Sequence, residues 1–511
     1  MGHSLPPAAD EFDIRLRDLA HPEDWRNPIP TGRYNLVVLG GGTAGLIAAA
    51  GAAGLGAKVA LIERRLLGGD CLNSGCVPSK ALIRSARAAA SVRLNQQFGI
   101  HPSGDMRVDF SAVMQRLRRL RSELANHDSA SRFAKLGVDV YLGEGRFSAD
   151  DTIEVSDQKL QFHRAVIATG ASPMLPAIAG LDADNVLTSE TVFSLTSLPR
   201  RLAVIGGGPV GCELAQAFAR LGSRVILIET STRILDREDA DAAELVFESL
   251  VRDGVDVHLG TTVESGVIAL DSTAAPVQRL SLSSSSGPRQ IEVDRILVGT
   301  GRKPNVAGLN LDLAHVNFDD IRGIHVDDRL RTTNPRIYAA GDVCSLQKLT
   351  HAADFMARIV LQNALFLGRL RVSHLIIPTC LYTSPEVAQI GLTEESARDR
   401  GIRVEVFMQS LDHNDRALLD GDSNGFVKIL VKAGTDRIVG ATIVAPHSGE
   451  MIGELVLAMT NRIGLRRLAQ AIHPYPTVAE AIRKCGDAYN RARLTPSVRR
   501  LLDFWLSWIR R

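Results

Sequence analysis

The stretch YNLVVLGGGTAG, residues 34–45, decides the fold of the N-terminal half of this chain. Residues 34–39 form an apolar run typical of a buried strand, and the glycines after it mark a tight turn into an Ala-rich helical stretch. A second apolar strand, VALIE at residues 59–63, ends on the acid Glu63. The order strand, glycine turn, helix, strand and acid predicts a unit that binds a dinucleotide.

In such a unit, each glycine has its own physical role. Gly40 permits the tight turn, Gly42 lets the backbone approach a pyrophosphate, and Gly45 lets helix and strand pack closely. The helix N-terminus offers free N–H groups and a positive dipole end to the phosphates. Glu63 is placed to accept hydrogen bonds from ribose hydroxyls.

The same pattern returns later in the chain. LAVIGGGPVG at residues 202–211 repeats the strand and the glycine turn, and VILIE at residues 225–229 repeats the second strand and its acid. Glu229 follows Gly206 at the spacing at which Glu63 follows the first glycine of its own copy. One such motif is weak evidence, but two matched copies predict two dinucleotides, a nicotinamide cofactor and FAD.

Length and charge exclude several other classes of protein. A chain of 511 residues predicts two to four domains, and a formal net charge of +2 argues against nucleic acid as a partner. No apolar stretch reads as a membrane-spanning helix. Six cysteines are too few for a disulfide scaffold, and we see no secretory signal, so we expect a cytoplasmic protein in a reducing compartment.

A close cysteine pair lies in the stretch GGDCLNSGCVPSK, residues 68–80. Four residues separate Cys71 from Cys76, whereas metal sites more often use a two-residue spacing and need further ligands nearby, so we predict no metal site. A disulfide that closes so short a loop is a plausible store for two electrons. Pro78 and Ser79 favour a helix that starts just after Cys76, which would lower the pKa of that thiol. The other cysteines are interpreted as buried apolar residues: Cys212, Cys344, Cys380 and Cys485.

The cysteine stretch resembles the active-site motif of the class I pyridine nucleotide-disulfide oxidoreductases, the family of dihydrolipoamide dehydrogenase, glutathione reductase and mercuric reductase. Further segments resemble family motifs in the family's order: 168–170 (ATG), 299–305 (GTGRKPN), 337–342 (IYAAGD) and 382–394. The resemblance implies an α/β fold with two Rossmann-like domains, for FAD and NAD(P), and an α+β C-terminal dimerisation domain.

The resemblance also implies domain limits and a homodimer with a shared active site. The expected domains are an N-terminal extension (1–32), an FAD-binding domain (33–172 and 300–370), an NAD(P)-binding domain (173–299), a dimerisation domain (371–490) and an amphipathic C-terminal tail (491–511).

By the same resemblance, Cys76 is the charge-transfer thiol beside the flavin and Cys71 is the interchange thiol that meets the substrate. Lys80 lies near the flavin and pairs with Glu213, because a cation there stabilises the reduced, anionic flavin. The cofactor-binding residues implied are Gly40, Gly42, Thr43, Ala44, Gly45, Glu63, Gly69, Lys80, Gly145, Thr169, Gly170, Asp342, His351, Gly206, Gly208, Gly211, Glu229 and Gly301.

The C-terminal stretch HPYPTVAE, residues 473–480, bears on the electron acceptor. Lipoamide dehydrogenase and glutathione reductase carry a His-Pro-Thr, in which the His is the acid–base and a later Glu orients it. Aligning that pattern with Glu480 places Tyr475 at the base, and a phenol with a pKa near ~10 accepts protons poorly at neutral pH. His473 does not match the position of the base but is an alternative.

Mercuric reductase also has a Tyr at this position, where its oxygen can help to bind a metal ion; packing of Tyr475 at the dimer interface fits the pattern equally well. The chain resembles that enzyme, although it has no cysteine after Cys485 where mercuric reductases end in a cysteine pair. We therefore expect a mercuric reductase-like enzyme that passes electrons from NAD(P)H through FAD and a Cys71–Cys76 disulfide to a disulfide, a soft-metal ion or a related small acceptor. The alternatives are dihydrolipoamide dehydrogenase and a membrane-peripheral NADH:quinone-type reductase.

Two further features concern the cofactor and the tail. Glu229 favours NADH because a carboxylate repels the 2′-phosphate of NADPH, while Arg233 nearby would accommodate that phosphate. Residues 495–511 read as a basic amphipathic helix with two of the three tryptophans. Peripheral membrane contact and packing on the protein's own surface both fit this pattern.

Overall fold

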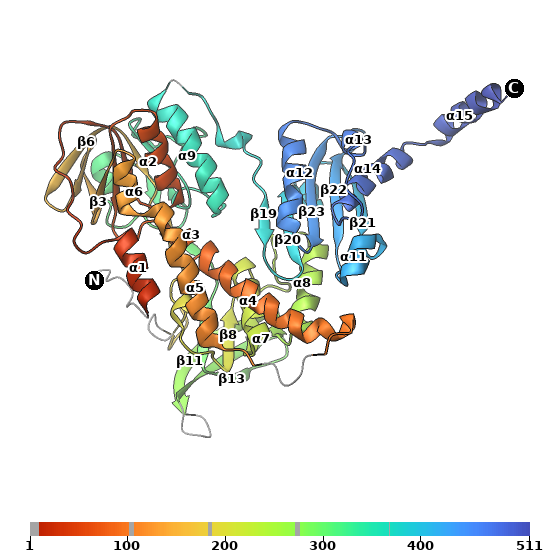
Figure 1. The fold of residues 1–511 in the computed structure, drawn as a ribbon, viewed down its shortest axis with the longest axis horizontal. Helices are drawn as coiled ribbons and strands as arrows, with labels where there is room; N and C mark the ends of the chain where they lie inside the picture. Colours follow the sequence, from red (N-terminus) through yellow and green to blue (C-terminus); the bar gives the residue numbers. More distant parts are fainter. Residues whose placement is uncertain (1–9, 102–106, 182–185, 271–275, 367, 511) are drawn as a thin grey trace. The chain divides into compact units, whose positions relative to one another are not determined.

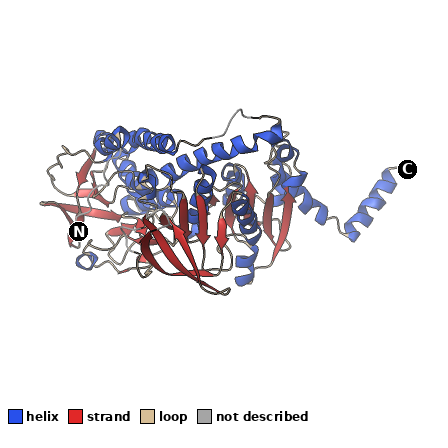
Figure 2. Cartoon of the chain, turned by 90° about the horizontal axis from the view of Figure 1, so that it is seen from below, coloured by secondary structure: helices blue, strands red, loops and turns tan. Residues whose placement is uncertain are grey.

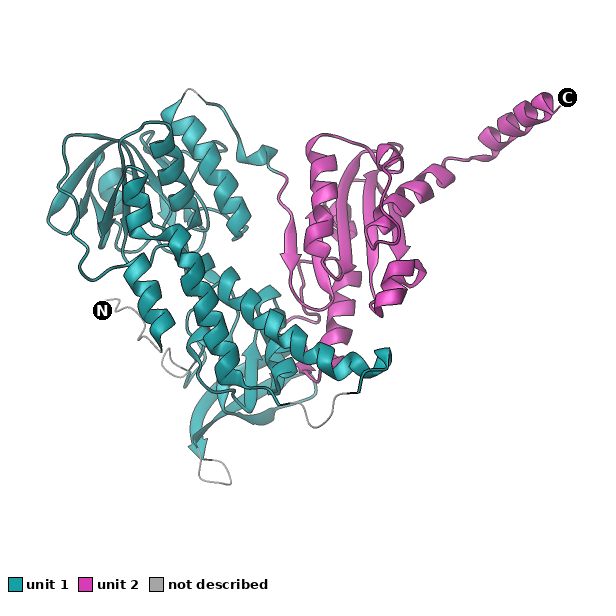
Figure 3. Ribbon diagram, viewed as in Figure 1, with its two compact units in different colours: residues 1–230, 260–375 teal, residues 231–259, 376–511 magenta. Residues whose placement is uncertain are grey.

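The computed structural model describes residues 10–101, 107–181, 186–270, 276–366 and 368–510. The chain folds into two compact units (Figure 3). The first comprises Met1–Thr230 and Gly260–Leu375, and the second comprises Ser231–Leu259 and Ile376–Arg511.

A parallel sheet carries the first glycine motif (Figure 1). Its strands are arranged in the order β3-β2-β1-β6, with β18 parallel to β6 on the other side, and β5 and β4 extend β6 antiparallel. Their bounds are β1 Tyr34–Leu39, β2 Val59–Glu63, β3 Val138–Leu142, β4 Gly145–Ala149, β5 Thr152–Val155, β6 Gln158–Ile167 and β18 Ile337–Ala339.

Both faces of this sheet are buried, which explains why its strands are apolar runs without polar alternation. Along β1, Leu36 and Val38 belong to one hydrophobic core, and Val37 and Leu39 belong to another on the opposite face. Helices α2 (Thr43–Gly54) and α9 (Thr350–Leu365) pack against each other over the first of these cores.

A helical region follows the first glycine motif, and part of the N-terminal extension packs against it. The region contains α3 (Gly69–Asn73), α4 (Cys76–Leu94), α5 (Phe110–Leu124) and α6 (Ala130–Lys135). Helix α1 (Glu11–Ala20) packs against α5, where Asp10 lies 2.6 Å from Arg118 and Asp13 lies 2.5 Å from Arg121. The beginning of the predicted extension, residues 1–9, lies outside the described residues.

The second glycine motif is built in the same way. Strand β8 lies between β9 and β14, parallel to both, and α7 follows the glycine turn. An antiparallel meander β11-β12-β13 lies between β9 and β14 in sequence, and the short pair β7 and β15 joins the entry and exit of this segment. The bounds are β7 Ala171–Pro173, β8 Arg201–Ile205, α7 Pro209–Leu221, β9 Arg224–Ile228, β11 Thr261–Leu270, β12 Pro276–Ser284, β13 Arg289–Val293, β14 Arg295–Val298, β15 Arg302–Pro304, β16 Phe318–Asp319 and β17 Gly323–Ile324.

The second unit is built on an antiparallel sheet, β19-β20-β23-β22-β21, and α11, α12, α13 and α14 contribute to its core (strands are red and helices blue in Figure 2). Its elements are α8 Ala240–Arg252, β10 Asp256–His258, β19 Thr379–Leu381, β20 Glu386–Gly391, α10 Glu394–Asp399, β21 Val404–Ser410, α11 Asp415–Asp420, β22 Phe426–Lys432, β23 Ile438–Ala445, α12 Ser448–Thr460, α13 Leu465–Leu468, α14 Glu480–Ala492 and α15 Pro496–Ile509. The predicted fold class, two Rossmann-like units and an α+β C-terminal part, is confirmed.

The two units are defined by contacts between residues, whereas the expected domains are defined by the cofactor that each would bind. Residues 231–259, expected in the NAD(P) domain, group with the C-terminal sheet, and the expected domain limits stay predictions. Within the described residues, no helix combines the length and the apolar character that crossing a bilayer requires.

A buried lysine joins α8 to the C-terminal sheet inside the second unit. Lys428 on β22 is 2% exposed, and its Nζ lies 3.0 Å from Asp239, 2.5 Å from Asp241 and 3.1 Å from Glu394. Burial pushes the pKa of Lys428 down, but the hydrogen bonds from its ammonium to Asp241 and Asp239 outweigh burial and raise it. The lysine therefore stays charged at neutral pH.

Replacing this lysine should be strongly destabilising, because Lys428→Met leaves the buried Asp239 carboxylate without its cation. We expect the free energy of unfolding to fall by about 3–5 kcal/mol. Urea unfolding of the flavin-loaded protein measures this change. Lys432→Met, at an exposed position of the same strand, is the matched control and should change it by less than about 0.5 kcal/mol. Equal effects of the two variants would contradict the role of the buried pair.

Candidate redox and nucleotide sites

The first glycine turn is a cradle that only glycine permits. Gly40 has φ +111°, and a Cβ on Gly45 would lie 1.8 Å from the Gly40 oxygen. Gly69, with φ +59°, brings the cysteine segment against this turn, and a Cβ there would lie 2.5 Å from the Gly42 Cα. No side chain caps the N-terminus of α2, so the turn presents its N–H groups. These features fit the pyrophosphate of FAD.

The second turn repeats this geometry. Gly206 has φ +108°, and a Cβ on Gly211 would lie 1.9 Å from the Gly206 oxygen. A Cβ on Gly208 would meet nothing within 4 Å, so open space lies in front of the N-terminus of α7, which no side chain caps. The turn fits a second dinucleotide phosphate.

Each acid at the end of the second strand is held by its own glycine turn. Glu63 Oε2 accepts from the Gly41 N–H at 2.6 Å, and Glu229 Oε2 accepts from the Gly207 N–H at 2.6 Å. The two copies therefore agree in backbone conformation and in the position of the acid, which supports one kind of ligand for both.

Segments on either side of the second glycine motif meet in the first unit. Asn305 N–H donates to the Gly170 oxygen at 3.0 Å, and Thr169 Oγ1 donates to the Asn305 oxygen at 2.7 Å. Gly170 has φ +70° and Gly301 has φ +127°. The segments expected to cross out of and back into the FAD domain therefore lie beside each other.

The cysteines frame a short helical loop. Helix α4 begins at Cys76 itself rather than just after it, with Gly75 as its N-cap. Asn73, between the cysteines, donates to the Gly69 oxygen at 2.8 Å, and Arg121 on α5 donates to the Asn73 oxygen at 2.8 Å. The loop that separates the thiols is thus held from inside and from a neighbouring helix.

The two thiols are in contact and differ in acidity. The hydrogen bond from the Cys71 thiol, the Thr350 hydroxyl 3.2 Å away and the charge of Lys80 lower the pKa of Cys76 to about 6 against the effect of burial. The hydrogen bond to Cys76 and burial raise the pKa of Cys71. Cys76 is therefore the thiolate at neutral pH. The direction expected from the helix start is right, although the hydrogen bond from Cys71 is its main cause.

This acidity predicts a pH dependence. The reactive Cys76 thiolate is present above its pKa and is lost as the pH falls through about 6. Thr350→Val removes one hydrogen bond to the thiolate and should raise the pKa of Cys76 by about one, whereas Thr350→Ser keeps the hydroxyl and should leave it unchanged. The rate of iodoacetamide alkylation of the reduced protein, measured against pH, reports the pKa of Cys76 in both variants. Identical profiles for Thr350→Val and the unaltered protein would contradict the contact.

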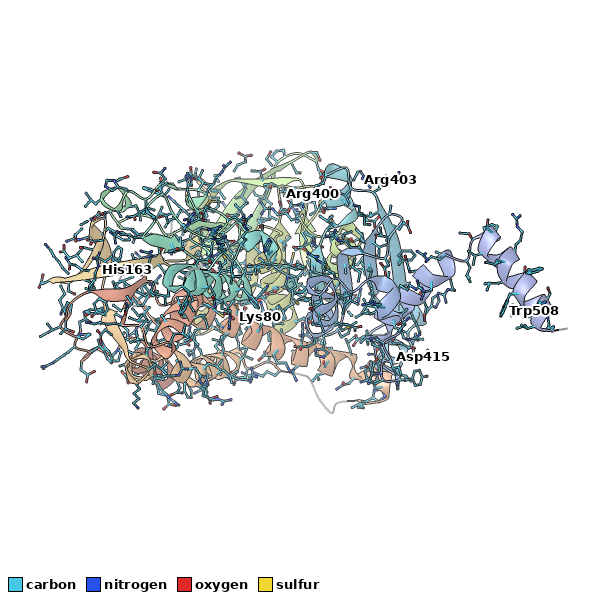
Figure 4. The ribbon with its side chains drawn as sticks, turned by 90° about the horizontal axis from the view of Figure 1, so that it is seen from above. Lys80, His163, Arg400, Arg403, Asp415 and Trp508 are labelled. Atoms are coloured by element: carbon cyan, nitrogen blue, oxygen red, sulfur yellow. The ribbon has the colours of Figure 1, made fainter. Side chains whose placement is uncertain are left out.

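A half-buried ion pair follows the cysteines on α4. Lys80 Nζ lies 2.9 Å from Glu213 Oε2 on α7, and the Glu213 side chain is 8% exposed (Lys80 is labelled in Figure 4). The helices that follow the cysteines and the second glycine turn pack against each other. The pair therefore ties the redox loop to the second nucleotide motif, as the resemblance implies.

Arg302 is a functional candidate that the sequence did not single out. Its guanidinium lies 3.2 Å from Asp70, which precedes Cys71, and 3.7 Å from Asp342. Burial raises the pKa of Asp342 although the charge of Arg302 opposes it. Arg302 lies within the motif at residues 299–305, so the sequence could have marked it as a candidate. Its partners could not be predicted, because they come from two distant segments.

Other predicted residues of the first unit are placed as follows. A Cβ on Gly145 would lie 2.6 Å from Leu39, so this glycine keeps β4 close to β1. His351 is an exposed residue in the first turn of α9, directly after Thr350. Cys212 and Cys485 are buried as expected, but Cys344 and Cys380 are only partly buried, which corrects that interpretation.

The C-terminal residues have partners of their own in the second unit. Tyr475 is 72% exposed and its hydroxyl donates to Asp415 at 2.8 Å, which raises the pKa of the phenol (Asp415 is labelled in Figure 4). Glu480 is paired with Arg483 at 2.7 Å. His473 Nε2 lies 3.0 Å from a carboxylate oxygen of Glu454. Asp415 was not expected as a partner of the tyrosine.

Among the described residues, no group of three His, Cys, Asp or Glu side chains is arranged to hold a metal ion.

Comparison with known proteins gives consistent results. Residues 34–357 match the family described as pyridine nucleotide-disulphide oxidoreductase, and residues 377–485 match its dimerisation domain. The chain is 35% identical to a mercuric reductase of Lysinibacillus sphaericus over 95% of this chain and 88% of that protein. It is 34% identical to the dihydrolipoyl dehydrogenase of Bacillus subtilis (strain 168) over 88% of this chain and 96% of that protein.

Solved structures agree with these relatives. The HOCl-induced flavoprotein disulfide reductase RclA from Escherichia coli is similar with a TM-score of 0.78 and 28% identity, covering 89% of this chain and 99% of that one. LpdA from Mycobacterium tuberculosis is similar with a TM-score of 0.79 and 27% identity, over 89% and 99% of the two chains.

Proposed function

The chain belongs to the pyridine nucleotide-disulphide oxidoreductases, and we propose that it reduces a soft-metal ion or a disulfide with electrons from NAD(P)H through Cys71 and Cys76. It is an enzyme of this class, whose members bind FAD and use NAD(P)H. The contact between the two thiols, with one of low pKa, is the observation that carries the proposal.

Both cofactors have matching cradles. The turn at Gly40–Gly45, with Gly69, Thr169 and Gly170 around it, is proposed to hold FAD, and the turn at Gly206–Gly211 to hold the nicotinamide cofactor. FAD held in the first cradle would supply hydride acceptance from NAD(P)H and an electron pair for the Cys71–Cys76 disulfide. The Lys80–Glu213 pair offers a fixed cation beside the cysteine loop, which stabilises negative charge there.

The chain's own thiols then balance the reaction. Two electrons break the Cys71–Cys76 bond and leave a thiolate on Cys76 and, with one proton, a thiol on Cys71. With a disulfide acceptor, Cys71 loses its proton and attacks one sulfur, which releases the other as a thiolate. Cys76 then attacks Cys71, which releases the second acceptor sulfur and restores the internal disulfide.

Soft-metal reduction makes smaller demands on the C-terminal residues. Disulfide exchange needs a group that moves a proton to the departing thiolate, and Tyr475, whose pKa is raised by its bond to Asp415, is a poor carrier at neutral pH. A divalent soft cation such as mercuric ion instead binds the two cysteine thiolates, takes their electron pair as the Cys71–Cys76 disulfide re-forms, and leaves as the neutral metal, without protonation of a leaving sulfur. This difference favours a metal ion, as in the mercuric reductases among the relatives.

Dihydrolipoamide dehydrogenase is the second candidate. Its support is the similarity to dihydrolipoyl dehydrogenases, whose length this chain nearly spans. The tyrosine in place of the expected base argues against it.

Turnover with a panel of acceptors tests the proposal: mercuric ion, Cu(II), lipoamide, glutathione disulfide and a quinone, each with NADH and NADPH. Cu(II) is included because RclA is known as a Cu(II) complex. We expect kcat/KM for a soft-metal ion to exceed that for lipoamide by at least about tenfold. Faster turnover of lipoamide would instead support the second candidate, and no turnover of any thiol-reactive acceptor would contradict the proposal.

We propose NADH as the preferred cofactor because the Glu229 carboxylate lies at the second glycine turn. Arg233, the alternative contact for a 2′-phosphate, is bound to Glu395 at 3.0 Å. Glu229→Ala should lower the ratio of kcat/KM for NADH over NADPH by at least about tenfold. The same change at Glu63, at the first turn, is the matched control and should leave that ratio unchanged. A ratio that stays constant in Glu229→Ala would contradict the assignment.

The dimerisation-domain match supports a homodimer. We further propose that the active site is shared, with Tyr475 and Glu480 of one protomer completing the cysteine site of its partner. We keep the domain limits expected from the sequence as part of this proposal.

A further inference from the structure

The last helix, α15 (Pro496–Ile509), is amphipathic along its whole length. With 100° between successive residues, Val498, Leu501, Leu502, Trp505 and Trp508 fall on one face. Ile509 falls within the same face, and Phe504 and Leu506 widen it to roughly 200° of the helix circumference. The opposite face carries Arg499, Arg500, Asp503, Ser507 and Arg510.

This apolar face has no partner within the described structure. None of the residues of α15 is buried, and the largest are widely exposed: Leu501 67%, Phe504 71% and Trp508 60% (Trp508 is labelled in Figure 4). The helix therefore does not pack on the surface of its own unit. So many large apolar side chains on one exposed helix mark an interaction surface.

The helix also has an N-terminal cap of its own. Pro496 occupies its first turn, and the Thr495 hydroxyl accepts from the Val498 N–H. The rings of Trp505 and Trp508 lie 5.3 Å apart and form a continuous aromatic surface.

The charge of the polar face and the width of the apolar face indicate what kind of surface covers α15. Three arginines against one aspartate make the polar face cationic, which suits an anionic surface. Paired tryptophans are typical of the boundary between lipid headgroups and acyl chains. The apolar arc is wider than the narrow seam that joins two helices in a coiled coil. A helix of 14 residues is about 21 Å long, too short to cross a hydrocarbon core of about 30 Å.

We propose that α15 docks the enzyme on a lipid bilayer that contains anionic phospholipid, with its tryptophan face in the membrane interface and its arginines at the headgroups. This inference does not depend on the electron acceptor. It assigns to the tail a binding function that the redox chemistry does not use.

Vesicle binding of the flavin-loaded full chain tests this. We expect the protein to float with phosphatidylcholine vesicles that contain phosphatidylglycerol, and to bind vesicles of phosphatidylcholine alone at least about tenfold more weakly. Raising the salt concentration should reduce binding. Because the chain has only three tryptophans, a blue shift of tryptophan emission on binding reports chiefly on α15.

Two variants and a control locate the effect. Trp505→Ser/Trp508→Ser and Arg499→Glu/Arg500→Glu should each weaken binding by at least about tenfold while flavin content stays unchanged. Ile321→Ser, at a residue that is 82% exposed in the first unit, should bind like the unaltered protein.

Three results would overturn the proposal. One is that the full chain does not bind the anionic vesicles. Another is that the tryptophan variant binds them as well as the unaltered protein does. The third is that, without lipid, light scattering shows a higher oligomer for the unaltered protein that only the tryptophan variant loses. In that case the apolar face of α15 would bind a second copy of the chain rather than a membrane.

Discussion

Replacing Cys76 by serine is expected to lower acceptor reduction by more than about 10³-fold while the bound flavin remains reducible by NAD(P)H. Cys76 holds the negative charge of the reduced pair, since its pKa is lowered to about 6 by the Cys71 thiol, Thr350 and Lys80. A serine hydroxyl cannot form the disulfide or carry that charge at neutral pH. Turnover assays and anaerobic titration with NADH measure the two halves separately.

Cys71→Ser should lose turnover to the same extent but give a different spectrum. The thiolate of Cys76 would remain, so the long-wavelength absorbance expected from a thiolate beside flavin should persist in Cys71→Ser and vanish in Cys76→Ser. Cys380→Ser, at a partly buried cysteine of the second unit, is the control for losing one thiol and should keep both properties. If Cys76→Ser kept the band, the roles of the two thiols would be wrongly assigned.

Adding one methyl group at the third glycine of each turn should separate the two cofactors. In Gly45→Ala and Gly211→Ala, the new Cβ would lie 1.8 Å and 1.9 Å from the oxygen of the first glycine of the turn, so the turn must open. Gly45→Ala should lower bound flavin at least about tenfold. Gly211→Ala should keep the flavin but lower kcat/KM for the nicotinamide cofactor by about 10²-fold.

Flavin absorbance, and reduction by dithionite compared with reduction by NADH, distinguish these outcomes. Gly54→Ala is the matched control, because a Cβ there meets nothing within 4 Å and Gly54 lies at the end of α2. Gly208→Ala tests the ligand itself, since its Cβ has free space in the protein and should interfere only with a bound pyrophosphate. Normal cofactor use by Gly211→Ala would contradict the proposed second cradle.

Much of the fold was predictable because its signals are local. The strands expected at 34–39 and 59–63 are β1 and β2 with those bounds, and the two strands of the second copy begin one residue earlier than expected. An apolar run, a turn that requires positive φ and an acid at a set spacing all act within one strand–helix–strand unit.

The surroundings of the thiols were less predictable. Thr350, which lies 274 residues from Cys76 in sequence, contacts it only because β18 pairs with β6 and delivers the start of α9 to that place. The same holds for Arg302, which meets Asp70 and Asp342 from a third segment. No local pattern marks these contacts, since they depend on the closure of the sheet.

The sequence by itself determined the two nucleotide-binding units, the cysteine pair and the amphipathic tail, because glycine conformation, cysteine spacing and helical periodicity are properties of neighbouring residues. Only the tertiary structure decided that the hydrogen bond from Cys71 is the main cause of the low pKa of Cys76, which partner holds Tyr475, and that Lys428 is buried among carboxylates of α8 and α10. Acidity and burial depend on the charges and atoms that distant segments bring within a few ångströms, and these distances are set when each unit folds.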